Sequence, residues 1–367
     1  MARVKLEDVC ERGSSNLKQS DVVDKDGDYP IYGASGYIGN VDFYHQEQPY
    51  VAVVKDGAGI GRTTLHPAKS SVIGTMQYLL PKGNVLPEYL CYVVKYMHLE
   101  KYFTGATIPH IYFKDYKNEE FNLDSLDRQK EIVSTLNKIE KVIESRTKEL
   151  ELLDELIRAR FVELFGEPEA NTKNWPVVNM ADLCTVGSSK RIYQSEQSMD
   201  GVPFWRISDL TNLINTGMAT AELFIPEERY MMLQAQEQVP VEGDILVTSR
   251  GTLGQCYIVR ADDKFYFQDG MISWLSEYAD GITPLYIAYL FSMPGFRKQI
   301  DSMQAGSTVA YLSIAMIRKL KVMLPDMETQ NQFSAFVAQI DKSKFEIQKS
   351  LEKTQLLLDS LMQEYFG

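Results

Sequence analysis

The chain has 367 residues, of which 44% are hydrophobic and 24% charged, a composition typical of a globular protein with two or three domains. It contains no apolar run as long as a membrane span and no signal-peptide core at its N-terminus, so we expect a cytoplasmic protein. The net charge is −12 and no segment of the chain is basic, which argues against tight, nonspecific binding of phosphate groups.

Residues 1–126 predict a first globular unit of mixed α/β structure. A short helix candidate at residues 4–10 precedes several segments of strand composition that are bounded by Gly and Pro. A helix is predicted at residues 87–102, with Pro87 in its first turn, and an irregular turn follows at residues 105–111. The strand candidates are residues 29–33, 37–39, 50–54 and 72–80.

Residues 127–166 predict one unbroken helix of roughly 60 Å. The segment has no Pro and no internal Gly, and it is rich in Glu, Lys, Leu and Arg, which favour helices. Its apolar residues recur at heptad spacing, which indicates a partner helix rather than a globular face. Arg146 and Arg160 interrupt this stripe of Ile132, Leu136, Ile139, Ile143, Leu150, Leu153, Ile157 and Leu164.

The partner helix is predicted within the same chain, at residues 328–367. This segment aligns with residues 127–166 without a gap at an offset of 201, so that Ile340 matches Ile139 and both segments end on Phe-Gly. The shared length, ending and register indicate an internal duplication rather than two unrelated helices. The stripe recurs as Phe333, Val337, Ile340, Ile347, Leu351, Leu358, Leu361 and Tyr365, with Lys344 and Thr354 as its weak points.

A short linker at residues 167–171 leads to a second globular unit at residues 172–327. Two of its phrases match the first unit, namely residues 178–184 at an offset of 174 and residues 306–312 at an offset of 201. Because the offset grows by 27 between these phrases, the second unit is expected to contain that much additional loop or strand. The interiors of the two units share almost no identity, as expected for two binding specificities on one scaffold.

This order of elements resembles the specificity subunits of type I restriction-modification systems, over essentially the whole chain. The resemblance rests on the alternation of two globular units with two 40-residue helices, and on two phrases. Residues 105–114 (GATIPHIYFK) are similar to the phrase that precedes each long helix in that family. Residues 127–133 (DRQKEIV) are similar to the usual start of the family's long helix.

The resemblance implies a fold and a division of labour. Each globular unit would be a target recognition domain of mixed α/β (α+β) fold, and the two long helices would pack as an antiparallel coiled coil with an approximate two-fold axis. Each domain would read one half of a bipartite, asymmetric site in double-stranded DNA. The helices would set the gap between the halves, as dimer geometry does in helix-turn-helix proteins.

The resemblance also implies partners. The chain would bind two methylase subunits, which carry S-adenosylmethionine and methylate adenine N6. It could also assemble with two motor-nuclease subunits. No cofactor is expected on this chain itself, and no membrane partner is expected.

The sequence contains no catalytic constellation that we would assign. Residues 57–62 (GAGIGR) and 250–255 (RGTLGQ) look like phosphate-cradling loops, but the first has GxGxG spacing rather than GxGxxG, and no GK[ST] follows. The Asn/Asp-Pro-Pro-aromatic motif of adenine methylases is absent. Four dispersed cysteines and four scattered histidines predict neither a disulfide framework nor a metal site. We therefore expect a non-catalytic subunit.

Two other functions remain open on the sequence alone. One is a coiled-coil adaptor with protein-binding globular heads, which the acidic charge suits. The other, with less support, is an enzyme that binds a nucleotide at the glycine-rich loops.

Candidate DNA contacts follow from residue type and loop position. Arg suits guanine, Gln suits adenine, and Lys, Ser, Thr or Tyr suit phosphates. Each candidate could instead be a solvated surface side chain, and His110 a hydrogen-bonded structural residue. The candidates in the first unit are Tyr37, Lys55, Arg62, Thr107, His110 and Lys114. Those in the second unit are Lys190, Arg191, Arg206, Ser249, Arg250, Thr252, Gln255, Thr308 and Tyr311.

A second apolar edge on the long helices predicts docking of the recognition domains or of the methylase subunits. A helix that is already paired needs no further apolar face unless something else covers it. The residues of this edge are Leu152, Leu156, Phe161, Phe165, Phe336, Leu357, Met362 and Phe366.

Overall fold

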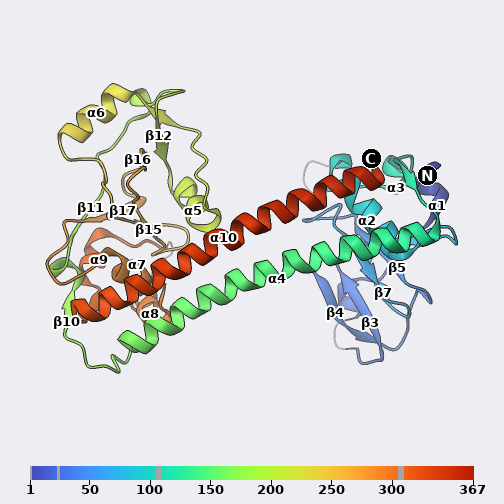
Figure 1. Cartoon of the computed structure of the whole chain (residues 1–367), viewed down its shortest axis with the longest axis horizontal. Helices are drawn as coiled ribbons and strands as arrows, with labels where there is room; N and C mark the ends of the chain where they lie inside the picture. Colours follow the sequence, from blue (N-terminus) through green and yellow to red (C-terminus); the bar gives the residue numbers. More distant parts are fainter. Residues whose placement is uncertain (1, 23–24, 105–108, 305–309) are drawn as a thin grey trace. The chain divides into compact units, whose positions relative to one another are not determined.

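The computed structural model describes residues 2–22, 25–104, 109–304 and 310–367, and it divides into two compact units (Figure 1). Unit 1 comprises Met1–Glu149 and Glu346–Gly367, and unit 2 comprises Leu150–Phe345. Two 40-residue helices, α4 (Leu126–Phe165) and α10 (Met327–Phe366), each contribute one part to each unit. The boundaries of the compact units therefore fall inside the long helices, whereas the domains predicted from sequence end where those helices begin.

The described residues in the globular part of unit 1 form three small sheets. The four-stranded sheet is antiparallel with the order β2-β8-β5-β6, and in the three-stranded sheet β3 pairs antiparallel with β4 and parallel with β7. The strands are β1 (Ala2–Lys5), β2 (Cys10–Ser14), β3 (Tyr29–Gly33), β4 (Gly36–Val41), β5 (Tyr50–Val54), β6 (Thr63–His66), β7 (Ser71–Val72), β8 (Met76–Pro81) and β9 (Glu120–Leu123), of which β1 and β9 form a separate pair. The helices are α1 (Leu6–Val9), η1 (Gln19–Asp21), α2 (Pro87–Tyr96), η2 (Leu99–Tyr102) and α3 (Phe113–Tyr116).

Unit 2 has sheets of the same sizes. Its four-stranded sheet has the order β11-β17-β14-β15, and in its three-stranded sheet β12 pairs antiparallel with β13 and parallel with β16. The strands are β10 (Val177–Asn179), β11 (Thr185–Gly187), β12 (Val202–Trp205), β13 (Phe224–Ile225), β14 (Ile245–Thr248), β15 (Cys256–Ile258), β16 (Tyr266–Phe267), β17 (Ile272–Ser276) and β18 (Lys321–Met323). The helices are η3 (Met180–Asp182), η4 (Gln194–Glu196), α5 (Ile207–Thr216), α6 (Glu227–Ala235), α7 (Pro284–Ser292), α8 (Pro294–Ser302) and α9 (Ile314–Lys319).

The two units follow one plan, strand for strand. The order β2-β8-β5-β6 in unit 1 corresponds to β11-β17-β14-β15 in unit 2, and the pair β1-β9 corresponds to β10-β18. The units differ between β12 and β14, where unit 2 contains α5 before β13 and α6 after it. The additional residues that the sequence predicted as loop or strand are therefore partly helical. The predicted internal repeat and mixed α/β fold are confirmed.

Contacts within each unit show that the long helices run antiparallel. In unit 1, Ile132 near the start of α4 shares a hydrophobic cluster with Phe366 at the end of α10. In unit 2, the ring of Phe161 near the end of α4 lies 5.5 Å from that of Phe333 near the start of α10. Because the start of one helix meets the end of the other in both units, the predicted antiparallel pairing is confirmed.

A buried glutamine ties the start of each long helix to the globular part. The Gln129 side chain is 0% exposed and accepts the backbone N–H of Leu86, the residue before α2, at 2.8 Å. It donates to the carbonyls of Asn84 at 3.0 Å and Asp124 at 2.9 Å. One side chain thus satisfies an N–H at the start of α2 that has no partner within that helix.

Gln330 repeats these three bonds in unit 2. Its side chain is also 0% exposed, accepts the N–H of Thr283 before α7 at 2.8 Å, and donates to the carbonyls of Gly281 at 2.8 Å and Pro325 at 2.9 Å. The glutamine near the start of each long helix is therefore explained by the structure, because in both units it fills a buried hydrogen-bonding site.

Aromatic contacts bury the end of each long helix in the same way, and they show what covers part of the predicted docking edge. The ring of Phe366 lies 5.2 Å from that of Tyr89 on α2, and the ring of Phe165 lies 4.7 Å from that of Tyr286 on α7. Phe161, Phe165 and Phe366 are 0% exposed. Of the two kinds of docking predicted for this edge, these three phenylalanines make the one with the globular parts, because each is buried in the core of its own unit, and they are not exposed to a partner subunit.

His66 lies at the end of β6 in an apolar site of unit 1. It is 6% exposed, and its ring centroid is 4.4 Å from that of Tyr32 and 5.3 Å from that of Tyr50. Its Nε2 lies 2.7 Å from Oγ1 of Thr64. Burial lowers the pKa of His66 from its ordinary value of 6.5 to about 4.

Among the described residues, no helix is long and apolar enough to cross a membrane.

We predict that Gln330→Leu lowers the free energy of unfolding of unit 2 by ~3 kcal/mol or more, because it leaves the N–H of Thr283 and two carbonyls buried without partners. Urea unfolding followed by tryptophan fluorescence measures this, since Trp175, Trp205 and Trp274 all lie in unit 2. The control is Gln332→Leu, two residues on and exposed, which should change stability little. Equal effects of the two substitutions would contradict the proposed role of Gln330.

A second prediction concerns pH. The pKa of His66 is lower in the folded state than in the unfolded state, so the unfolded chain binds the additional proton and unit 1 loses stability as the pH falls from 6.5 towards 4. Between pH 7 and 4.5 the loss at this site should be about 2 kcal/mol. Hydrogen exchange of the β5 amides, corrected for intrinsic rates, should show this loss in the wild type and less of it in His66→Gln. A pH dependence that is unchanged in the variant would rule out His66 as its source.

Candidate nucleic-acid interface

In unit 1 the loop that follows the inner strand β5 meets the segment that precedes α3. The N–H of Ile111 donates to the carbonyl of Lys55 at 3.0 Å, and the N–H of Gly57 donates to the carbonyl of Pro109 at 3.0 Å. The sequence nominated residues in both stretches as DNA contacts. The structure brings the described parts of these stretches side by side.

Unit 2 forms the same junction. The N–H of Leu312 donates to the carbonyl of Ser249 at 3.0 Å, which is the bond that Ile111 and Lys55 make in unit 1. Ser249 therefore occupies the backbone position of Lys55, although the two residues differ.

The far ends of the two loops correspond as well. The carbonyl of Arg62 accepts the N–H of Val54 at 2.9 Å, and the carbonyl of Gln255 accepts the N–H of Thr248 at 2.9 Å. The two candidates that the sequence assigned to guanine and adenine, Arg62 and Gln255, thus stand at one equivalent position of the repeated frame.

The glycines make both loops tight turns. Gly61 has φ +81°, and a Cβ there would lie 2.7 Å from the backbone nitrogen of Glu100. The N–H groups of Gly57, Gly61 and Gly254 all donate to backbone carbonyls of the fold. Because these three amides are already used, they are not free to bind a phosphate.

The side chains of unit 1 at this junction are polar, and several are held by hydrogen bonds or ion pairs. Arg62 is exposed, and its Nη1 donates to the carbonyl of Ala34 at 3.0 Å, which holds the guanidinium against a neighbouring turn. Nδ1 of His110 lies 2.6 Å from Oδ1 of Asp56, and Nζ of Lys55 lies 3.6 Å from Oδ2 of the same carboxylate. His110 is therefore hydrogen-bonded, as the sequence analysis allowed, yet its side chain remains 38% exposed.

Two further candidates of unit 1 lie on its surface. Tyr37 on β4 is 62% exposed, and its hydroxyl donates to Oδ1 of Asn40 at 3.0 Å. Lys114 on α3 is exposed, with Nζ 5.3 Å from the ring centroid of Tyr112. Thr107 and its counterpart Thr308 in unit 2 lie outside the described residues.

In unit 2 the junction presents Arg250, with its guanidinium carbon 5.3 Å from the ring centroid of Tyr311. Thr252 is exposed in the same loop, and Nε2 of Gln255 donates to Oδ1 of Asn215 at 3.1 Å. Ser249 corrects a prediction: it is 1% exposed and its hydroxyl is 2.8 Å from that of Ser273, so it belongs to the core and is not a DNA contact.

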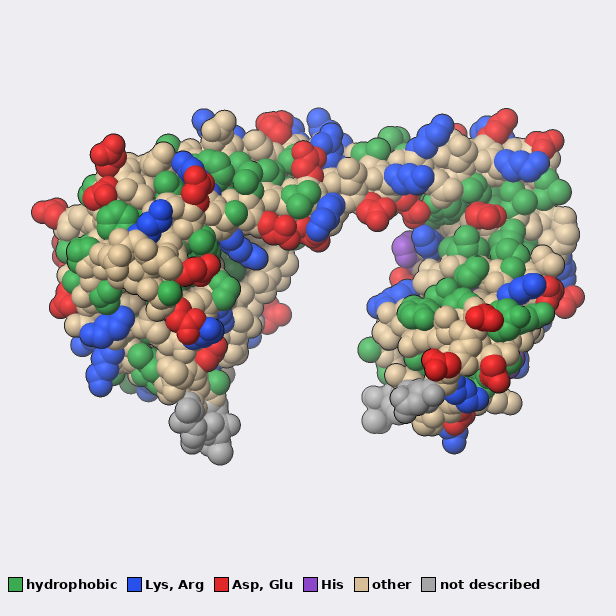
Figure 2. Space-filling view, turned by 90° about the horizontal axis from the view of Figure 1, so that it is seen from below, with side chains coloured by type: hydrophobic (Ala, Val, Ile, Leu, Met, Phe, Trp, Pro, Cys, Tyr) green, Lys and Arg blue, Asp and Glu red, His purple; other side chains and the backbone are tan. Residues whose placement is uncertain are grey.

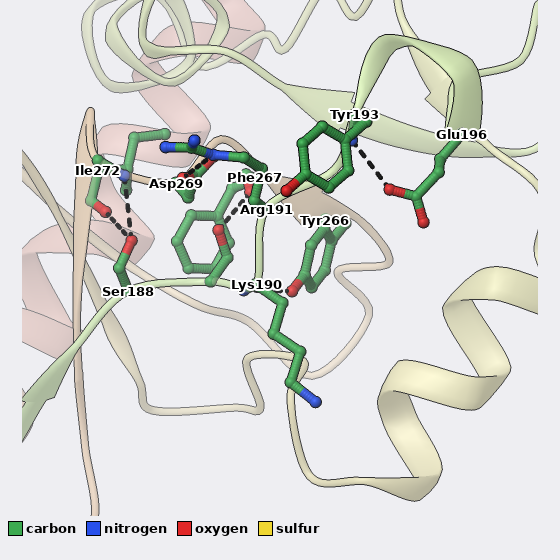
Figure 3. Close-up of polar contacts among 11 residues, drawn as sticks. Ser188, Lys190, Arg191, Tyr193, Glu196, Tyr266, Phe267, Asp269 and Ile272 are labelled. Carbon is green, nitrogen blue, oxygen red and sulfur yellow. Dashed lines mark hydrogen bonds and ion pairs between the residues drawn. The ribbon is translucent and has the colours of Figure 1, made fainter.

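The segment after β11 carries two of the remaining candidates (Figure 3). Nε of Arg191 is 2.8 Å from Oδ2 of Asp269, and Nζ of Lys190 donates to Oε1 of Gln236 at 2.8 Å. Tyr193, which the sequence analysis did not select, is 63% exposed on the same segment. This segment is anchored where the backbone N–H of Lys190 donates to the hydroxyl of Tyr266 at 2.8 Å.

Arg206 is less available for DNA than predicted. Its Nε lies 3.3 Å from Oδ2 of Asp209, and its Nη2 lies 2.9 Å from Oε2 of Glu222. Hydrogen bonds to these carboxylates raise the pKa of Arg206 above its ordinary value. The guanidinium is thus neutralised locally at the start of α5.

The long helices expose apolar side chains in both units. Leu152 and Leu156 in unit 2 are 51% and 47% exposed, and Leu357 in unit 1 is 51% exposed. Phe336 and Met362 from the predicted edge are half-buried. Three further apolar side chains of these helices, which were not predicted for this edge, are also exposed: Val142 to 45%, Phe345 to 65% and Leu356 to 69%.

Charged side chains do not segregate on the face shown in Figure 2, where Lys and Arg alternate with Asp and Glu. Among the described residues, no group of three or more His, Cys, Asp or Glu side chains is placed to hold a metal ion. The polar junctions after β5 and β14 are therefore the best-defined candidate sites.

Comparisons with known proteins agree with the repeated architecture. The chain is 24% identical over 339 residues to the type I restriction enzyme MjaVIII specificity subunit of Methanocaldococcus jannaschii, covering 84% of this chain and 77% of the relative. It is 22% identical over 347 residues to the putative type I restriction enzyme specificity subunit S.HindORF215P of Haemophilus influenzae, covering 92% and 86%.

Two solved structures share the fold. The S subunit of a type I restriction-modification system from M. genitalium has a TM-score of 0.58 at 16% identity, covering 100% of this chain and 96% of that one. A chain from a structural study of complex assembly and conformational transition in the type I R-M system has a TM-score of 0.55 at 14% identity, covering 99% and 97%.

The family model described as the type I restriction modification DNA specificity domain matches residues 1–155 and 172–357. Each match contains one globular unit together with most of the long helix that follows it. The chain therefore belongs to the family of type I restriction modification DNA specificity proteins.

Proposed function

We propose that this chain is the sequence-reading subunit of a type I restriction-modification complex, in which each unit reads one half of a bipartite, asymmetric DNA site. The observation that carries this proposal is the repeated junction after β5 and β14. One backbone frame, with equal hydrogen bonds at both ends of the loop, carries different side chains in the two units. A constant frame with variable polar side chains is what two readers of different half-sites require.

The chain itself transfers no methyl group in this proposal. Adenine N6 is methylated by two partner subunits that carry S-adenosylmethionine, and the extraction of the adenine from the helix is their task. Two motor-nuclease subunits could join the same assembly for restriction. The complex acts on DNA in the cytoplasm.

The positions of the exposed leucines support two copies of one partner. Leu156 and Leu357 are equivalent under the 201-residue repeat, and they are exposed to 47% and 51%. A repeated apolar side chain on each long helix, one in each unit, suits a methylase subunit bound at each.

The charge of the chain favours DNA binding within a complex. The net charge is −12, so the cations at the junctions act against a repulsive background. Partner subunits that bring their own positive charge would therefore raise the affinity for DNA, and specificity would depend on the few side chains that reach the bases.

The direct test is methylome sequencing of a methylation-free host that expresses this chain with its methylase partner. We expect a bipartite motif with one N6-methylated adenine in each half and a gap of fixed length. The control is the methylase expressed without this chain, which should give no such motif. A stable purified complex that leaves the genome unmethylated would contradict the proposal and favour an adaptor.

We predict that Leu156→Asp and Leu357→Asp each weaken assembly with the methylase, because each places a charge where an apolar contact is proposed. The apparent affinity should fall about tenfold or more, equivalent to ~1.4 kcal/mol. Size-exclusion co-elution and titration of the purified subunits measure this. Met199→Asp is the control, since Met199 is 93% exposed and lies in the globular part of unit 2. Co-elution unchanged by both leucine substitutions would remove these residues from the interface.

A further inference from the structure

In each unit a pair of side chains meets at the junction, and the two pairs occupy equivalent backbone positions. Asp56 follows Lys55 and His110 precedes Ile111 in unit 1, while Arg250 follows Ser249 and Tyr311 precedes Leu312 in unit 2. The bonds from Ile111 to Lys55 and from Leu312 to Ser249 are both 3.0 Å long. Asp56 is thus the counterpart of Arg250, and His110 is the counterpart of Tyr311.

The pair in unit 2 presents a guanidinium. Arg250 is exposed, and its guanidinium lies 5.3 Å from the half-buried ring of Tyr311. The backbone N–H of Tyr311 donates to Oε1 of Gln304 at 2.8 Å. Within the described ranges Arg250 has no carboxylate partner, in contrast to Arg191 and Arg206, which are paired with acidic groups. A stacked guanidinium without a counter-charge keeps its donors free and loses little entropy on binding.

The pair in unit 1 presents an imidazole. Asp56 accepts from Nδ1 of His110 at 2.6 Å, and its other oxygen faces Nζ of Lys55 at 3.6 Å. The carboxylate therefore has a positive or donating partner on each oxygen and acts as a support. The carboxylate fixes the ring through Nδ1. Nε2 of His110 has no hydrogen-bond partner in the part of the chain that the structure describes, so it is free to contact a base.

We propose that these positions form the principal base-reading pair of each unit, with the roles of the two members exchanged. In unit 2 Arg250 reads a guanine through O6 and N7, and Tyr311 is the positioning residue beneath it. In unit 1 His110 contacts a base edge through Nε2, and Asp56 is its positioning residue. This inference rests on the proposed function and adds which side chain discriminates in each half-site.

The exchange of roles makes the two half-sites unequal. Arginine makes two parallel hydrogen bonds to guanine, whereas imidazole can make only one hydrogen bond through Nε2. Discrimination at the position read by Arg250 should therefore be stronger than at the position read by His110. We expect a strict guanine in the half-site of unit 2.

The test uses the full chain in complex with its methylase, with methylome motifs and DNA affinities measured on sites that vary one base pair at a time. Arg250→Ala should reduce discrimination at one guanine in one half-site by about 10-fold to 100-fold and leave the other half unchanged. Tyr311→Ala should relax that same position, while Tyr311→Phe, which keeps the ring, should not.

The complementary variants address unit 1. His110→Ala should relax one position in the opposite half-site, and Asp56→Ala should relax the same position, whereas Asp56→Asn keeps an acceptor for Nδ1 and should have a smaller effect. Lys264→Ala is the control, because it removes an exposed cation that is paired with Glu227 and lies outside the junction. Its motif should be that of the wild type.

The outcomes separate this inference from the proposed function. If the wild type gives no bipartite motif, both fail. If the wild type gives one and Arg250→Ala retains full discrimination, the reading pair is wrong and the proposed function stands. If Arg250 and His110 affect the same half, both fail, because the two units would then read one half-site together. A uniform loss of affinity with discrimination intact would assign Arg250 to a phosphate and would also overturn the inference.

Discussion

Two buried glutamines hold the architecture together. Gln129 and Gln330 each satisfy an N–H at the start of a shorter helix and two loop carbonyls, without access to water. A buried polar side chain with all three bonds made is stabilising only in one geometry, because any shift leaves groups unpaired. The glutamines therefore define how each long helix meets its globular part, and the aromatic contacts of Phe366 with Tyr89 and of Phe165 with Tyr286 do the same at the other ends.

The two units hold different side chains on the same backbone frame. The sheets have the same strand order in both units, and the loops after β5 and β14 are held by matching backbone hydrogen bonds. Side chains at these junctions differ between the units, with aspartate in place of arginine after β5 and β14 and histidine in place of tyrosine before α3 and α9, while the backbone frame is the same. Recognition of DNA needs such a separation, since phosphate contacts and fold set the register while a few side chains choose the bases.

The parts of the fold that follow from periodicity were predictable from sequence. Heptad spacing and the 201-residue repeat gave both long helices, their partnership and the duplicated plan. Position on the helix surface was harder, because Phe161, Phe165 and Phe366 lie off the heptad stripe yet are buried by the globular parts. The second apolar edge predicted that something covers these residues, but it could not distinguish the globular parts from the methylase subunits, since the contacts with α2 and α7 join segments far apart in sequence.

The candidate site was predictable in outline. The glycine-rich loops and the phrases before α3 and α9 marked the two sides of each junction, but their meeting depends on tertiary structure. Asp56 was missed because its partner His110 is 54 residues away, and Ser249 was misassigned because its burial arises from Ser273 on a neighbouring strand. Residue type nominates a contact, whereas exposure and partners decide whether the side chain is free to make it.

The central claim is that two equivalent units each read one half of a divided site. Hydroxyl-radical footprinting of the full complex on DNA that carries its methylation motif tests this most directly. The account predicts strong protection of two separate half-sites, and weakened protection of one half alone when Arg250 is replaced by alanine. A single continuous protected tract that Arg250→Ala weakens uniformly would contradict it.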